Sequence, residues 1–120
     1  MIRIISSILL ISILYSQSEC DGVRYTDEIF TNVNVTSNVL YGGNYNPNIW
    51  GQNEWQDLYM DIYQPVGDDV ENRPLVFFLF GGSFVAGSKT NGDIVELCTR
   101  YAKMGYVAVS IDYRLTTDLI

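Results

Sequence analysis

Two runs of apolar residues that flank a helical pattern constrain the fold of this chain more than any other feature. Residues 75–80 are six consecutive apolar residues, and residues 106–111 form a second, nearly continuous run. Such runs are typical of strands buried on both faces of a parallel sheet. Between them, apolar residues recur at helical spacing, namely Ile94, Leu97, Cys98, Tyr101 and Ala102. With Gly105 as a suitable helix end, the pattern predicts a strand–helix–strand unit over residues 75–112 and an α/β fold.

Antiparallel strands are predicted to lead into this unit. Residues 56–64 alternate with the period of a half-buried strand. One side carries Leu58, Met60 and Ile62, and the other carries Asp57, Tyr59, Asp61 and Tyr63. Pro65 ends this strand, and residues 30–36 predict one edge strand.

Residues 41–52 predict a loop between these two strands. Gly42-Gly43 and Asn46-Pro47-Asn48 are turn-forming sequences. Trp50 and Trp55 are large enough to cover an edge of the core, and we interpret them in this way rather than as ligand-stacking residues.

The first 18 residues are typical of a signal peptide. Arg3 provides a positive start, residues 4–15 are mostly apolar, and Ser16-Gln17-Ser18 offers small residues for cleavage after Ser18. The apolar run is shorter than the ~20 residues of a membrane-spanning helix, so no stable membrane anchor is expected after cleavage. The sequence therefore predicts a secreted or periplasmic protein. In that oxidising location Cys20 and Cys98 could each form a disulfide, although a buried free thiol suits Cys98 equally well.

Charge and residue content exclude several classes of function. The net charge is −7 at pH 7, which would repel nucleic acid. The chain contains no histidine, the most common general base and zinc ligand. The acidic residues of segment 66–73 fit no calcium-binding spacing, so we interpret the segment as a solvated turn. We expect no cofactor and no metal.

The segment after Phe80 is the predicted site of function, because ligands of open α/β sheets bind beyond the carboxyl ends of the strands. It reads Gly81-Gly82-Ser83-Phe84-Val85-Ala86-Gly87-Ser88. Glycines allow sharp turns and expose N–H groups that can bind a negative oxygen. The spacing of neither phosphate-binding glycine motif is present, so a tetrahedral oxyanion is the remaining candidate.

Four motifs in order then resemble the carboxylesterase and lipase branch of the α/β-hydrolase family. They are residues 58–65, 73–76, 80–84 with Gly87-Ser88, and 110–115, and the resemblance covers about residues 56–115. It implies that residues 19–120 are the N-terminal part of an α/β-hydrolase domain acting on small-molecule carboxylic esters. It also implies that the backbone N–H groups of Gly82 and Ser83 form part of the oxyanion hole.

The sequence departs from the family pattern in two ways. The family usually has His-Gly-Gly-Gly, whereas Phe80 stands in the histidine position and Ser83 in that of the third glycine. The nucleophile motif Gly-x-Ser-x-Gly is also missing, so the chain would carry no catalytic triad and is expected to be inactive alone. We interpret Ser83, Ser88, Ser110 and Asp112 as structural side chains. A non-catalytic, cholinesterase-like binding or adhesion member of the same fold is the alternative, and a related serine peptidase fits the loop less well.

Overall fold

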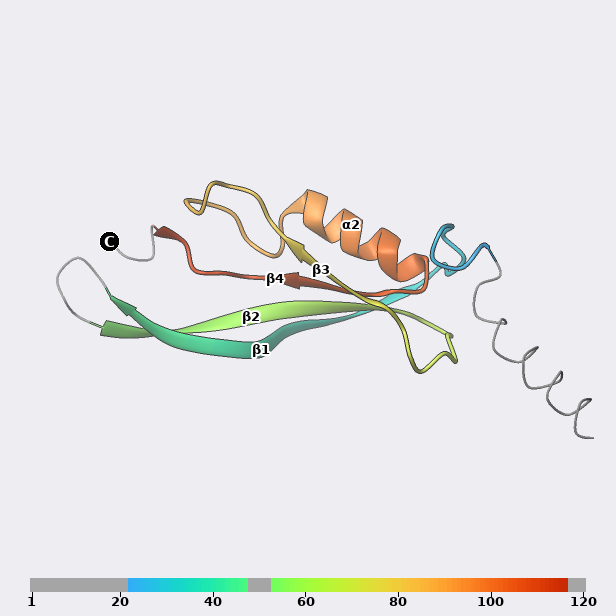
Figure 1. Ribbon diagram of the computed structural model, residues 1–120, viewed down its shortest axis with the longest axis horizontal. Coiled ribbons are helices and arrows are strands. Elements are labelled where there is room, and N and C mark those ends of the chain that lie inside the picture. Colours follow the sequence, from blue (N-terminus) through green and yellow to red (C-terminus); the bar gives the residue numbers. More distant parts are fainter. Residues whose placement is uncertain (1–21, 48–52, 117–120) are drawn as a thin grey trace, which may run out of the picture.

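A computed structural model describes residues 22–47 and 53–116, which form a four-stranded mixed sheet with one helix against it (Figure 1). The strands lie in the order β1-β2-β4-β3. The β1–β2 and β2–β4 pairs are antiparallel, and β3 and β4 are parallel. The elements are β1 (Val33–Pro47), β2 (Asn53–Pro65), β3 (Leu75–Leu79), α2 (Gly92–Lys103) and β4 (Val107–Ile111). The predicted fold class, with antiparallel strands leading into a parallel strand–helix–strand unit, is confirmed.

Helix α2 forms where the apolar periodicity predicts it. Its buried residues are Ile94, Cys98 and Ala102, which share the face toward the sheet. Asp93 in the first turn and Arg100 and Lys103 in the last have the charges that the helix dipole favours. The chain leaves the helix through Gly105, whose φ of 100° is accessible mainly to glycine.

The core lies between α2 and the sheet, and it decides which side of β2 is buried. Tyr63, Phe80 and Ala108 pack with the buried residues of the helix. On β2 the side toward this core carries Asp61 and Tyr63, which are 3% and 4% exposed, whereas Met60 and Ile62 are only half-buried. The sequence pattern missed this because the carboxylate of Asp61 has a buried cationic partner, Lys89, far along the chain.

The β1–β2 hairpin is longer than predicted, and the prediction of a loop over residues 41–52 is wrong for residues 41–47. Strand β1 continues to Pro47 and pairs with β2 throughout, with two irregularities in register. A Cβ atom at Gly43 would lie 2.7 Å from Cζ2 of Trp55, so glycine within this strand leaves room for the indole ring. Trp55 is itself 57% exposed and packs edge-on against Tyr45, so it covers no core among the described residues.

Strand β3 is buried on only one face, although its sequence predicts burial on both. Phe78 packs toward the core and against Tyr101 of α2. Leu75, Phe77 and Leu79 alternate with it and are each more than half exposed. The difference arises because β3 is an edge strand here, and because α2 covers one side of the sheet only (Figure 1).

Several predictions concern residues outside the described ranges, namely the signal peptide over residues 1–18, Cys20 and Trp50. Cys98 is a fully buried free thiol, and its pKa is raised to about 11 by burial and by the nearby carboxylate of Asp61. Within residues 22–47 and 53–116, no helix is long and apolar enough to cross a membrane.

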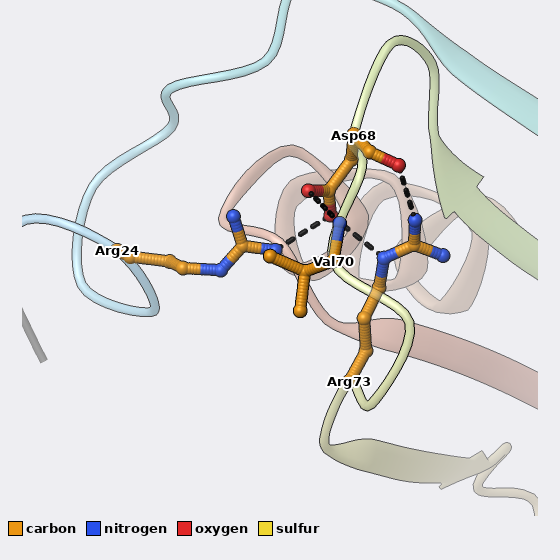
Figure 2. Close-up of polar contacts among 4 residues, drawn as sticks. All are labelled: Arg24, Asp68, Val70 and Arg73. Atoms are coloured by element: carbon orange, nitrogen blue, oxygen red, sulfur yellow. Dashed lines mark hydrogen bonds and ion pairs between the residues drawn. The ribbon is translucent and has the colours of Figure 1, made fainter. Parts of the chain in front are cut away.

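Asp68 joins the N-terminal segment to the loop between β2 and β3, as Figure 2 shows. Its Oδ2 atom accepts hydrogen bonds from Arg24 Nη2 at 2.6 Å and from Arg73 Nε at 2.7 Å. Oδ1 accepts the N–H of Val70, and the Asp68 side chain is only 3% exposed. This acidic residue of the loop is thus neutralised by two guanidinium groups. Burial would raise the pKa of Asp68, but these three hydrogen bonds outweigh it and lower the pKa.

We expect Asp68→Asn to lower the free energy of unfolding by about 3 kcal/mol at about pH 7, because it leaves two guanidinium groups without their anion. Since the folded pKa is depressed, the contribution of Asp68 is present above the unfolded pKa of ~3.9 and is lost as the pH falls through the folded pKa. Urea unfolding at several pH values measures this difference. The exposed Asp69→Asn is the control, and an equal loss in both variants would contradict the assignment.

Candidate functional site

The loop between β3 and α2 lies beyond the carboxyl end of β3, where the sequence places the functional site. Residues 112–116 leave the parallel neighbour β4 at the same end of the sheet, so the two segments lie side by side (Figure 1). Hydrogen bonds join them at several points. The site is therefore built from one loop and from the segment that supports it.

The loop turns sharply at Gly82 and continues through two residues with left-handed backbone. Gly82 has a φ of 140°, and its carbonyl accepts the N–H groups of Val85 and Ala86. A Cβ atom at Gly82 would lie 1.8 Å from the carbonyl oxygen of Ala86, so only glycine fits this turn. Ser83 and Phe84 have φ values of 54° and 60°. Such angles cost on the order of 1–3 kcal/mol for each residue other than glycine and persist only where the surroundings enforce them.

The predicted site residues Gly82 and Ser83 are both exposed at this turn. Within the described part of the chain, neither backbone N–H donates a hydrogen bond to another residue. Both groups are therefore free to bind an oxygen atom supplied by a ligand. Two adjacent donors on a fixed turn are the arrangement that stabilises a developing oxyanion.

Two residues of the segment after β4, Tyr113 and Thr116, hold the first half of the loop. Tyr113 stacks on Phe80 with ring centroids 4.3 Å apart, and its hydroxyl donates to the Phe80 carbonyl oxygen at 2.7 Å. Thr116 donates its N–H and its hydroxyl to the carbonyl oxygen of Phe84, at 2.7 and 2.9 Å. Phe80 is 4% exposed and belongs to the core, so the aromatic ring in the position of the family's histidine supports the loop from beneath.

The absence of a side chain at Gly87 leaves room for the Phe80 ring beneath the loop. Its φ is 127°, and a Cβ atom there would lie 2.4 Å from the Phe80 ring. The sequence pattern alone indicates no role for the side chains of Tyr113 and Thr116. The only available signal was their place directly after the second apolar run, since the carboxyl ends of parallel strands lie together.

Lys89 holds the second half of the loop. Its Nζ atom forms an ion pair with Asp61 Oδ1 at 2.7 Å, with both side chains about 5% exposed. Its backbone N–H donates to Asp112 Oδ1 at 2.8 Å. Asp112 thus binds loop backbone, as its structural interpretation implies.

Ser88 and Ser110, the other two serines interpreted as structural, lie away from the turn at Gly82 and Ser83 in the sequence. The hydroxyl of Ser88 lies 2.7 Å from that of Thr90, and its N–H donates to the side-chain oxygen of Asn91. Ser110 is fully buried on β4. Among the described residues, no three His, Cys, Asp or Glu side chains gather into a group that could hold a metal ion.

Comparisons with known proteins identify the family and the fold of the chain. The model of the BD-FAE family, an α/β-hydrolase-type domain, matches residues 60–120. A bacterial brefeldin A esterase, described as a homologue of human hormone-sensitive lipase, superposes over 91% of the chain with a TM-score of 0.50 and 18% identity. Esterase B from Lactobacillus rhamnosis superposes over 98% with a TM-score of 0.51 and 22% identity. The predicted family resemblance is confirmed.

The chain spans about a third of the length of these two esterases. It covers 28% of the brefeldin A esterase and 35% of esterase B. No curated protein sequence matches the chain.

The turn geometry leads to a test with two neighbouring glycines. Ala at position 81 meets open space among the described residues, whereas Ala at position 82 collides with the backbone carbonyl of Ala86. We expect Gly82→Ala to lower the free energy of unfolding by about 2 kcal/mol and Gly81→Ala by less than about 0.5 kcal/mol. Urea unfolding of the full-length protein measures both. Equal effects at the two positions would show that the turn differs from the one described.

Proposed function

The chain belongs to the BD-FAE family of α/β-hydrolase-type domains, and we propose that it supplies part of the oxyanion hole of a serine hydrolase acting on carboxylic esters. One observation carries the proposal. Gly82 and Ser83 are exposed residues on a constrained turn at the carboxyl end of β3, and their N–H groups bind no described residue.

The proposed reaction is acyl transfer. A serine hydroxyl loses its proton to a histidine and attacks the ester carbonyl carbon, and the carbonyl oxygen becomes negative in the tetrahedral intermediate. The two N–H groups would bind that oxygen. Removing one such donor typically costs about 2.7–4 kcal/mol of transition-state stabilisation. The serine, acid and histidine would come from further residues of the full-length protein, and the 120-residue chain would be inactive alone.

Substrate class and location form the finer part of the proposal. The substrate is a small-molecule ester, and the net charge of −7 disfavours polyanionic partners. The protein is exported, to the periplasm or the medium, with the mature chain beginning near Glu19. This rests on Arg3, the apolar segment 4–15 and the small residues before Glu19.

A non-catalytic binding or adhesion protein of the same fold is the second candidate. Ser83 favours it, because a side chain at the third glycine position narrows the approach to the donors and takes a left-handed backbone angle. Phe80 also favours it, since a core aromatic ring stands where the family has histidine. The two candidates differ in whether the full-length protein turns over an ester at all.

Substitutions at Ser83 test the backbone-only role in the full-length protein. Ser83→Ala keeps the N–H, so we expect kcat/KM for p-nitrophenyl acetate within about tenfold of the parent, or about 1.4 kcal/mol. Ser83→Gly should be at least as active, because glycine relieves the strain of the positive φ. Gly82→Pro would remove a donor and is expected to lower kcat strongly, but proline cannot adopt the φ of 140°, so the loop would change as well.

Two results would count against the proposal. Loss of turnover in Ser83→Ala with the fold intact would assign the chemistry to its hydroxyl. Absence of ester hydrolysis by the parent would favour the binding protein.

A further inference from the structure

Lys89 and Asp61 form the only ion pair between the loop and β2 among the described residues. The Nζ–Oδ1 distance is 2.7 Å, and the side chains are 6% and 5% exposed. Asp61 lies in the middle of β2, opposite Ser110 of β4. The same Oδ1 atom also accepts the backbone N–H of Asn38 from β1 at 2.8 Å. The position of the Asp61 carboxylate is therefore fixed by β2, which carries it, and by β1, which donates a hydrogen bond to it, independently of Lys89.

The backbone of Lys89 is fixed as firmly as its side chain. Its N–H donates to Asp112 Oδ1 at 2.8 Å. Asp112 is itself tied to β2, since its N–H donates to the carbonyl oxygen of Tyr59 at 2.9 Å and its own carbonyl accepts the hydroxyl of Tyr41. Lys89 thus joins the end of the loop to the central strands through two separate bonds.

We propose that the buried Asp61–Lys89 ion pair is a positioning device that keeps the Gly82 and Ser83 N–H groups aligned for the oxyanion. The inference rests on the proposed function of this loop. The turn contains consecutive positive φ angles at residues 82, 83 and 84, which a free loop would relax. Tyr113 and Thr116 hold the loop before and within this strained turn, and Lys89 holds it after the turn.

A buried pair of charges suits this task better than an apolar contact. Burying an ammonium group is unfavourable unless it meets its partner at short distance with good geometry. Any movement of the loop that separates Nζ from Oδ1 therefore leaves two buried charges unpaired. An apolar side chain at position 89 would tolerate small shifts of the loop, and catalytic donors lose their effect with shifts of that size.

The test compares Lys89→Met with Arg73→Met in the full-length protein. Arg73 is a matched control because it also forms a 2.7 Å ion pair with a buried aspartate, Asp68, at the other end of the sheet (Figures 1 and 2). We expect both variants to lower Tm. Only Lys89→Met should lower kcat for p-nitrophenyl acetate, by at least about tenfold with KM within about threefold. Only Lys89→Met should also speed amide hydrogen exchange of residues 81–88, by about tenfold.

Each outcome decides the matter. Unchanged kcat and unchanged exchange of residues 81–88 in folded Lys89→Met would overturn the proposal, as would equal changes in Arg73→Met. If Lys89→Met does not fold, Asp61→Asn replaces it, since the amide keeps an acceptor oxygen for Lys89 and a smaller effect of the same kind is expected. If the parent hydrolyses no ester, the proposed function fails, whereas the exchange comparison still decides whether the ion pair holds the loop.

Discussion

The close contact between α2 and the middle of the sheet supports the rest of the structure. It is made by small side chains, since Cys98, Ala102 and Ala108 are all completely buried. Small residues let the helix approach β4 closely, and the larger Tyr63 and Phe80 complete the same buried cluster. This packing fixes β4 between β2 and β3. It thereby brings the loop after β3 and the segment after β4 to the same end of the sheet.

At that end of the sheet, contacts with neighbouring segments hold the strained turn of residues 82–84 on both sides. The backbone of residues 82–84 takes positive φ angles, and the contacts of Tyr113, Thr116 and Lys89 surround it. Gly82 and Ser83 are exposed, whereas Phe80 and Lys89, which support the loop, are buried. An oxyanion hole needs donors that are already oriented before the charge develops, because reorientation during the reaction would raise the barrier. The strained turn and its supports are therefore what the proposed oxyanion hole would require.

The sequence predicted those features that depend on neighbouring residues. The apolar runs, the helical spacing and the stop at Gly105 are local signals, so the strand–helix–strand unit and the place of the glycine loop followed from them. Features that depend on distant partners were missed. The burial of Asp61 depends on Lys89, 28 residues away, and the extension of β1 through Gly43 depends on the indole of Trp55 across the hairpin. The exposure of Phe77 depends on which neighbours cover an edge strand, which an apolar run does not encode.

The central claim is that the N–H groups of Gly82 and Ser83 bind the oxyanion of an ester's tetrahedral intermediate. The most direct measurement is a crystal structure of the full-length protein after reaction with a phosphonate ester, whose tetrahedral phosphorus mimics that intermediate. The account predicts a phosphoryl oxygen about 2.7–3.1 Å from both the Gly82 and the Ser83 nitrogen atoms. A phosphoryl oxygen beyond about 3.5 Å from both nitrogen atoms, held by other groups, would contradict it.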